Sequence, residues 1–223
     1  MIHVSPGAPE RAALEGAGFR IAPELHQHEG QGSASIMVEF ADSFLELAWR
    51  DEQVRVAPGL EIVATRYQKQ ADWRESGWSP FGVGMRRRPA APDSFPVPTK
   101  RVRAEWMEPD AFLDILAPGD TLGPRLWVVS ASMAANGRAE SAGERHRLAS
   151  PKNFQHPNGA RRITRVRMFV PSRSRTQAAA MLARHSAVEF RAAKEWRLEV
   201  TLDDGVQHVT RDLRPRLPLV FHL

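Results

Sequence analysis

Two glutamates occupy positions where a side chain could do chemistry, each between apolar neighbours in a strand-like run. Glu46 lies in FLELAWRD, residues 44–51, and Glu199 lies in RLEVTLDD, residues 197–204. Successive side chains of a strand point to opposite faces, so the carboxylate and its aliphatic neighbours cannot share a face. We expect the aliphatic side to pack on a helix. Each carboxylate then lies on a solvated face or in a binding cavity, where its charge would need compensation.

Three histidines are candidates for the same chemistry. In MIHVS the alternation puts Ile2 and Val4 on the helix side, which leaves His3 on the face of the glutamates. His28 precedes the Gly-rich turn EGQG, where a surface turn residue is the simplest interpretation. His156 precedes a proline, which holds it extended. The turn HPNG explains its proline, asparagine and glycine but not the histidine, so a pocket role and a structural role both stay open.

The elements that must position these residues form similar series at the two ends of the chain. The sequence predicts strand, helix and three strands at the N-terminal end, over residues 1–5, 10–18, 18–25, 33–40 and 43–50. Near the other end it predicts strands over 161–170, 187–192, 195–203 and 207–213, with a helix over 177–185. Thr176 is the expected N-cap of that helix. The closing residues 214–223 are expected to be extended because of their prolines.

The middle of the chain is less regular. We expect a Pro-rich link over 89–98, a short helix over 109–116, a strand over 126–132 and a polar loop over 135–153. The predicted organisation is an N-terminal βαβββ module over 1–53, an irregular middle over 54–160 and a C-terminal βαβββ module over 161–223. Together these form one domain.

Composition excludes several classes of protein. The chain has 223 residues, of which 42% are hydrophobic, enough for a substantial core. It has no cysteine, which excludes disulfides, thiolate zinc sites and cysteine nucleophiles. No apolar run approaches the roughly 20 residues that span a bilayer, and the first residues do not resemble a signal peptide. We therefore expect a cytoplasmic protein with no membrane partner.

The net charge of +5 comes with arginine clusters at residues 86–88, 161–162 and 172–175. Such clusters can bind phosphates. Acidic residues interrupt them and no aromatic residues alternate with them, so the pattern does not favour nucleic-acid binding.

The paired βαβββ series, with a histidine on the first strand and a glutamate on the last, resembles the vicinal oxygen chelate superfamily, which includes glyoxalase I, extradiol dioxygenases and bleomycin-resistance proteins. Over nearly the whole chain, short motifs resemble the glyoxalase-like domain proteins: GAPE at 7–10, HEGQGSAS at 28–35, FLEL at 44–47, SPFGVGMR at 79–86, QHPNGA at 155–160 and RDLRPRLPL at 211–219. The resemblance implies an α+β fold in which the modules form curved mixed sheets around a cavity, and a homodimer as its assembly.

The resemblance also implies a metal site. His3 and Glu46 would come from the first module and Glu199 from the second. The first strand of the second module has Arg165 or Arg167 where a ligating histidine is expected, and arginine has no lone pair to donate. Two interpretations stay open. The histidine and two carboxylates hold a divalent ion (Mn, Fe, Ni or Zn) with open positions, or an arginine pairs with a glutamate and replaces the charge of the metal.

Further residues would contact the substrate if the resemblance holds. His28 and His156 would line the pocket, Arg86 would receive a substrate carboxylate, and Arg165 and Arg167 would suit an anionic ligand. Phe81 either lines an apolar pocket or fills the gap between modules. Arg87 and Arg88 are expected to be solvated.

Two functions follow. The first is a metal-assisted lyase, isomerase or dioxygenase acting on a small oxygenated substrate, in which the ion stabilises an enolate and Glu46 or Glu199 is the general base. The second is a metal-free protein that binds or sequesters a small molecule, which the arginines would suit if that molecule is an anion.

Overall fold

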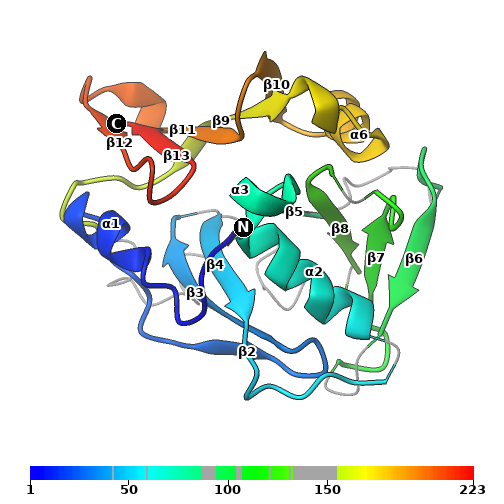
Figure 1. The fold of residues 1–223 in the computed structure, drawn as a ribbon. Coiled ribbons are helices and arrows are strands. Elements are labelled where there is room, and N and C mark those ends of the chain that lie inside the picture. Colours follow the sequence, from blue (N-terminus) through cyan, green and yellow to red (C-terminus); the bar gives the residue numbers. More distant parts are fainter. Residues whose placement is uncertain are drawn as a thin grey trace.

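The computed structural model describes residues 1–41, 43–58, 60–86, 94–103, 107–120, 122–130, 132 and 155–223. In these residues the chain forms three sheets and short helices (Figure 1). The α+β class predicted from the sequence is therefore confirmed. The polar loop predicted over 135–153, and Arg87 and Arg88, lie outside the described residues.

The N-terminal residues form the first sheet. Its strands are β1 (Ile2–His3), β2 (His26–His28), β3 (Ser33–Glu39) and β4 (Phe44–Arg50), in the order β1-β4-β3-β2. Strand β1 runs parallel to β4, and the other pairs are antiparallel. Helix α1 (Arg11–Gly16) follows β1. The strand predicted over 18–25 is wrong, because residues 18–25 pair with no other strand. Pro23 in that stretch has no N–H to donate to one.

The middle of the chain forms a second sheet and not an irregular segment. Its strands are β5 (Gly82–Arg86), β6 (Thr99–Val102), β7 (Leu113–Leu116) and β8 (Arg125–Val129), in the order β5-β8-β7-β6. Strand β5 runs parallel to β8 and the other pairs are antiparallel, so order and directions repeat those of the first sheet. The helix predicted over 109–116 is wrong, because β7 pairs with β6 on one side and β8 on the other. Between β6 and β7, Nε of Arg101 donates to the carboxylate of Asp114 at 2.9 Å.

Helix α2 (Glu61–Ala71) and the short helix α3 (Trp73–Ser76) connect the two sheets. Helix α2 lies against β4 and β1 (Figure 1). Its buried side includes Leu60 just before the helix, then Ala64 and Tyr67. This spacing of three or four residues is the helical signal, which the sequence analysis did not use.

The C-terminal residues form a third sheet with a different topology. Its strands are β9 (Ile163–Pro171), β10 (Val188–Ala193), β11 (Arg197–Leu202), β12 (Thr210–Asp212) and β13 (Leu219–His222), in the order β10-β9-β11-β13-β12. Short 3₁₀ turns cover Ser172–Ser174 and Asp203–Gly205. In this sheet β9, the first strand of its series, lies between β10 and β11, whereas β1, the first strand of its series, lies at the edge of its strand order. The second copy of the strand order is therefore in residues 82–129, not in 161–223.

Helix α6 (Gln177–His185) begins as predicted, because the hydroxyl of Thr176 accepts the backbone N–H of Ala179 at 3.4 Å. Its apolar side, with Met181 and Leu182, packs on Leu126 and Val128 of the second sheet.

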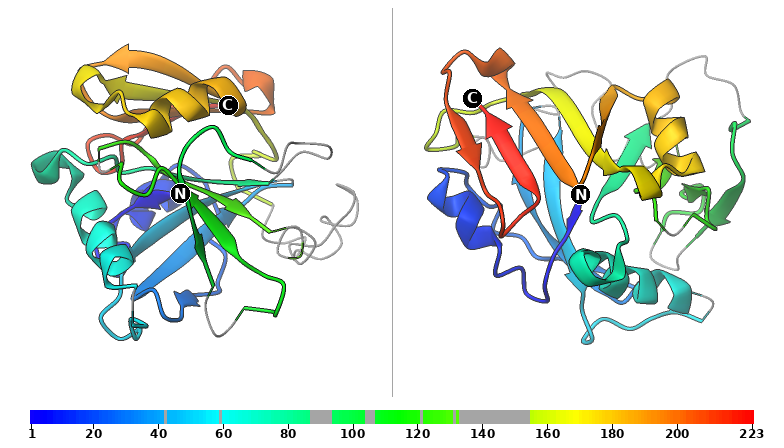
Figure 2. Two further views of the ribbon diagram at one scale, coloured as in Figure 1. Left: turned by 90° about the vertical axis from the view of Figure 1, so that its right-hand side faces the viewer. Right: turned by 45° about the horizontal axis from the view of Figure 1, so that its top comes forward.

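The main core lies between the first sheet and the C-terminal sheet, which stack in Figure 2. Leu45, Leu47 and Trp49 of β4 share this core with Leu198 and Val200 of β11, and α1 adds Leu14. The aliphatic faces of the two glutamate-bearing strands thus face one shared core. The alternation then places their glutamates on opposite sides of it.

The edges of the first and second sheets are joined at β1 and β5. Ile2 and Phe81 form an antiparallel bridge. His3 donates its backbone N–H to the carbonyl of Pro80 at 2.8 Å, and Gly82 donates to the carbonyl of Met1 at 3.1 Å. We call the side of these joined sheets that carries the His3 side chain the inner face.

The turn after α1 depends on a glycine. Gly18 has φ +82°, and a Cβ there would lie 3.0 Å from the Cβ of Asn158. We predict that Gly18→Ala lowers the free energy of unfolding by at least about 1–2 kcal/mol, because an L side chain is strained in this conformation. Gly16→Ala is the control: nothing lies within 4 Å of its Cβ position, and alanine favours the helix. Urea denaturation of both variants checks this, and equal effects would contradict it.

Candidate functional site

The inner face of the first sheet is polar and covered by α2. His3 pairs with Ala48 in the register of β1 and β4, so His3 shares a face with Glu46, two residues along. The antiparallel register adds His28, which lies opposite Ser33. The opposite face of the same strands carries the leucines of the core. The sequence-based assignment of Glu46 to the side away from the leucines therefore agrees with the register.

Glu46 and His28 form a hydrogen-bonded pair. Nε2 of His28 lies 3.4 Å from Oε1 of Glu46, and the hydroxyls of Ser33 and Ser35 lie 3.0 and 3.3 Å from the two nitrogens of the ring. Burial alone would raise the pKa of Glu46. The hydrogen bond and charge of His28, with smaller contributions from the chain's amino group and Ser35, outweigh burial and lower that pKa. Glu46 is therefore a buried carboxylate whose charge is compensated, and His28 is part of this network.

His3 is buried without hydrogen bonds to its ring. Its residue exposure is 1%, and neither Nδ1 nor Nε2 has a partner among the residues that the structure describes. The ring packs edge-on against Tyr67 of α2, with 5.0 Å between centroids. Burial lowers the pKa of His3 well below its usual value, and the positive charges of Arg125 and of the chain's amino group act in the same direction. The neutral imidazole thus offers one donor and one acceptor.

Arg125 of β8 lies on the same inner face. It pairs in register with Gly82, the residue that follows the β1–β5 bridge. Its Nη1 is buried and has no hydrogen-bond partner. The guanidinium carbon lies 5.0 Å from the ring centroid of Tyr67 and 5.9 Å from that of Trp127. His3 and Arg125 therefore contact the same tyrosine, although they are more than a hundred residues apart in sequence.

Gln70, one helical turn after Tyr67, completes this set. Its Nε2 donates to the carbonyl of Ser79 at 3.0 Å, while its buried Oε1 has no partner. His3, Gln70 and Arg125 are each nine-tenths buried or more. We call these three residues the unpartnered cluster. The sequence does not predict Gln70 and Arg125 as site residues, because the packing of α2 brings Gln70 to this face and the contact between the two sheets brings Arg125.

The second sheet supplies no metal ligands at the positions that correspond to those of the first. The bridge between β1 and β5 makes Gly82 the counterpart of His3. Counting from the same register makes Gly123 the counterpart of Glu46. Neither glycine has a side chain, so of the metal ligands that the resemblance implies only His3 and Glu46 lie on the inner face.

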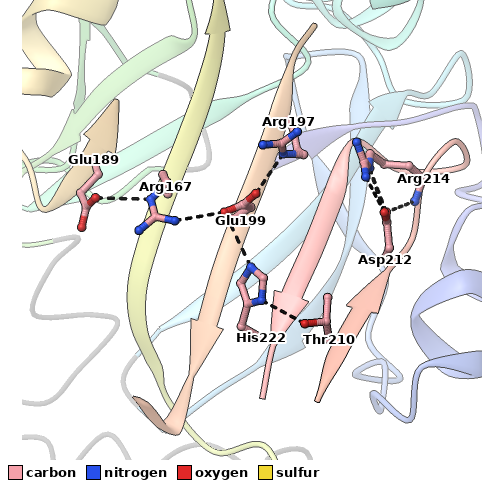
Figure 3. Close-up of polar contacts among 8 residues, drawn as sticks. All are labelled: Arg167, Glu189, Arg197, Glu199, Thr210, Asp212, Arg214 and His222. Carbon is pink, nitrogen blue, oxygen red and sulfur yellow. Dashed lines mark hydrogen bonds and ion pairs between the residues drawn. The ribbon is translucent and has the colours of Figure 1, made fainter. Parts of the chain in front are cut away.

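Glu199 lies on the outer face of the C-terminal sheet, where arginines compensate it (Figure 3). Its carboxylate lies 3.2 Å from Nη1 of Arg167, 3.0 Å from Nε of Arg197 and 3.6 Å from Nε2 of His222. Arg167 also bonds Glu189 at 3.4 Å. Of the two sequence-based alternatives, the pairing with arginine describes Glu199.

The set of metal ligands expected from the sequence is therefore not assembled. The main core separates Glu199 from His3 and Glu46. Within the described part of the chain, no group of three or more His, Asp or Glu side chains is placed to hold a metal ion. Arg165, expected to bind substrate, pairs with Glu189 at 3.3 Å on the outer face, and its side chain is 59% exposed.

His156 holds backbone segments together. Its Nδ1 accepts the N–H of Arg20 at 3.0 Å, and its Nε2 lies 2.9 Å from the carbonyl of Glu39. The ring packs between Phe19 and Phe40. Both ring nitrogens are thus used by the backbone, which favours the structural alternative.

Phe81 is 1% exposed and packs edge-on against Trp196 at 5.9 Å. It fills the interior between the first sheet and the C-terminal sheet, in agreement with the second of its two expected roles. Arg86 is exposed at the end of β5. It lies four residues after Gly82 in that strand, so the alternation puts it on the same side as the inner face, at the far end from His3.

A pocket of about 510 Å³ lies elsewhere, beside the start of α6. Its charged residue, Asp120, accepts the backbone N–H groups of Ala178 at 2.9 Å and Gly123 at 3.0 Å. None of the expected site residues lines this pocket. The unpartnered cluster is therefore the stronger candidate.

Comparisons with protein-family models, curated proteins and solved structures found no match. The function has to be argued from the site itself. None of the helices in the described ranges has the length and apolar character needed to cross a bilayer.

The buried histidines predict sensitivity to acid. Burial lowers the pKa of His156, against a smaller opposite effect of the Glu39 carbonyl, and Arg20 lowers it further. The unfolded ring titrates near about 6.5, so the unfolded chain binds more protons than the folded one between that value and the lower folded pKa. The free energy of unfolding should hence be highest above the unfolded pKa and should fall as the pH drops through this window. His3 acts with the same sign.

Urea denaturation at a series of pH values tests this. His156→Gln keeps a donor and an acceptor but no titrating group, so it should lose less stability on acidification than the wild type. His185→Gln, on the exposed side of α6, is the control and should follow the wild type. Identical pH dependence of the two variants would show that His156 does not contribute.

Proposed function

We propose that this chain is a glyoxalase-like protein that binds a small molecule on its inner face, beneath α2. The observation that carries the proposal is the unpartnered cluster of His3, Gln70 and Arg125. The repeated strand order and the joined β1 and β5 edges support the paired-module architecture that the resemblance implies.

Buried polar atoms without a partner are costly. The large majority of buried side-chain polar atoms in native proteins have a partner, and each one left without a partner costs about 1–3 kcal/mol. Three residues on one face share this defect here. A bound molecule with complementary polar groups would satisfy them together, so ligand binding explains a set of residues that folding alone does not.

A metal-assisted enzyme is the second candidate. The unpartnered nitrogens of His3 favour it, since a ring nitrogen without a hydrogen bond is free to ligate. His3 and Glu46 would hold the ion, which when bound supplies Lewis-acid stabilisation of an enolate. The Glu46–His28 pair would hold a proton nearby. Against this candidate, Glu46 is already compensated by His28, and the charge of Arg125 near His3 opposes a second cation.

Screening small fragments tests the binding function. We expect some neutral or charged fragments to raise the melting temperature of the wild type and to shift ring signals of His3 in NMR spectra. His3→Leu should lose these responses while staying folded, since it removes the unpartnered nitrogens. Gln70→Met provides a second variant of the cluster.

His185→Leu is the matched control and should respond like the wild type. If no fragment binds, or if binding survives in both cluster variants, the inner face is not the ligand site.

Elemental analysis tests the second candidate. The protein is incubated with Mn, Fe(II), Ni or Zn and then desalted. The binding proposal predicts no retained metal in the wild type. One equivalent retained by the wild type and lost in both His3→Ala and Glu46→Gln would instead establish a metal centre held by these two residues.

A further inference from the structure

We propose that the ligand of the inner face is a small organic carboxylate with a hydroxyl on the neighbouring carbon. The carboxylate pairs with Arg125, and the hydroxyl bonds His3 and Gln70. This inference rests on the proposed function, because it names the class of molecule that the unpartnered cluster takes.

The charge of Arg125 requires an anion. A guanidinium stays protonated in a protein, and a buried charge without a partner is strongly destabilising. Arg125 is 9% exposed and its Nη1 has no hydrogen bond. Among the described residues no carboxylate forms an ion pair with it, and Glu46 on the same face pairs with His28. We infer that the ligand supplies the negative charge that the described residues do not.

The surroundings favour a compact anion. A carboxylate suits the guanidinium of Arg125, because planar guanidinium and carboxylate groups bond in pairs. The rings of Tyr67 and Trp127 flank the guanidinium. Side chains also crowd the glycines of β5: a Cβ at Gly82 would meet Met1 at 2.5 Å, and one at Gly84 would meet Trp127 at 2.9 Å. A large ligand would have to displace these side chains.

The other two residues of the cluster select a hydroxyl. Neutral His3 needs one acceptor for its N–H and one donor for its bare nitrogen. The Oε1 of Gln70 needs a donor. A hydroxyl can accept the N–H of His3 and donate its one hydrogen to Oε1 of Gln70, whereas a carboxylate only accepts. The bare nitrogen of His3 then needs a second donor on the ligand. Tyr67 contacts both His3 and Arg125, and Gln70 follows it by one helical turn, so one small molecule can be expected to reach all three.

Four probes separate the contributions of charge and hydroxyl. Lactate carries both groups, propionate only the carboxylate, lactamide only the hydroxyl, and inorganic phosphate a different oxyanion. Isothermal titration calorimetry at constant ionic strength should give the tightest binding for lactate, then propionate, with lactamide and phosphate weakest. Phosphate binding more tightly than lactate would overturn the choice of a carboxylate.

Variants of Arg125 test the pairing. Arg125→Met should weaken lactate binding at least about thirtyfold, since it removes one partner of a buried charge pair, and should reduce lactamide binding far less. Arg125→Lys keeps the charge without the planar fork and should lie in between. Arg191→Met, whose side chain is 57% exposed on the outer face, is the control.

The same substitution has an opposite effect on stability. Without ligand, Arg125→Met should melt at a higher temperature than the wild type, because an apolar side chain of similar length replaces an unpaired buried charge. A lower melting temperature would mean that the protein itself compensates Arg125, which would contradict the inference. An Arg125→Met variant that does not fold is less stable than the wild type, so it contradicts the inference in the same way. Lactate binding can then still be measured with Arg125→Lys.

The two proposals can fail separately. If fragments bind through His3 but lactate binds no better than lactamide, the carboxylate is wrong and the ligand site remains. If neither the probes nor any fragment binds, both proposals fail.

Discussion

The bridge between Ile2 and Phe81 is the contact on which the candidate site depends. It joins the edge of the first sheet to the edge of the second, so that β4, β1, β5 and β8 share one continuous inner face. Residues from three distant parts of the chain meet there under α2: His3, Gln70 and Arg125. The side chain of Phe81 is buried in the core on the opposite side of this junction, where it packs against Trp196. Without the bridge between Ile2 and Phe81, His3 and Arg125 would lie on separate sheets.

The two sides of the first sheet have opposite energetic roles. On one side, leucines and aromatic residues pack against α1 and the C-terminal sheet, and burial of this apolar surface stabilises the fold. On the other side, α2 covers polar side chains. Among the described residues, His3, Gln70 and Arg125 have buried polar atoms without a partner there. Natural proteins tolerate such costs where function requires them. The outer face of the C-terminal sheet differs, because arginines of the protein compensate Glu199 there. The charge of Glu199 therefore needs no ligand.

Local patterns predicted local structure well. Alternation in FLEL placed Glu46 opposite the leucines, and Thr176 caps its helix as expected. The pairing of modules was misjudged, since the similarity of FLELAWRD to RLEVTLDD describes two strands and says nothing about their neighbours in a sheet. Helix α2 could have been found from the spacing of Leu60, Ala64 and Tyr67. No pattern in the sequence marks Arg125, because its importance comes from a contact with residues far away in the chain.

A high-resolution crystal structure grown in the presence of lactate would test the central claim most directly. The account predicts density for one small molecule between Arg125, His3 and Gln70, with its carboxylate within hydrogen-bond distance of Nη1. An Arg125 side chain paired with a carboxylate of the protein, or turned away from His3 and Tyr67, would contradict it. In that case the inner face would be a structural polar layer and not a ligand site.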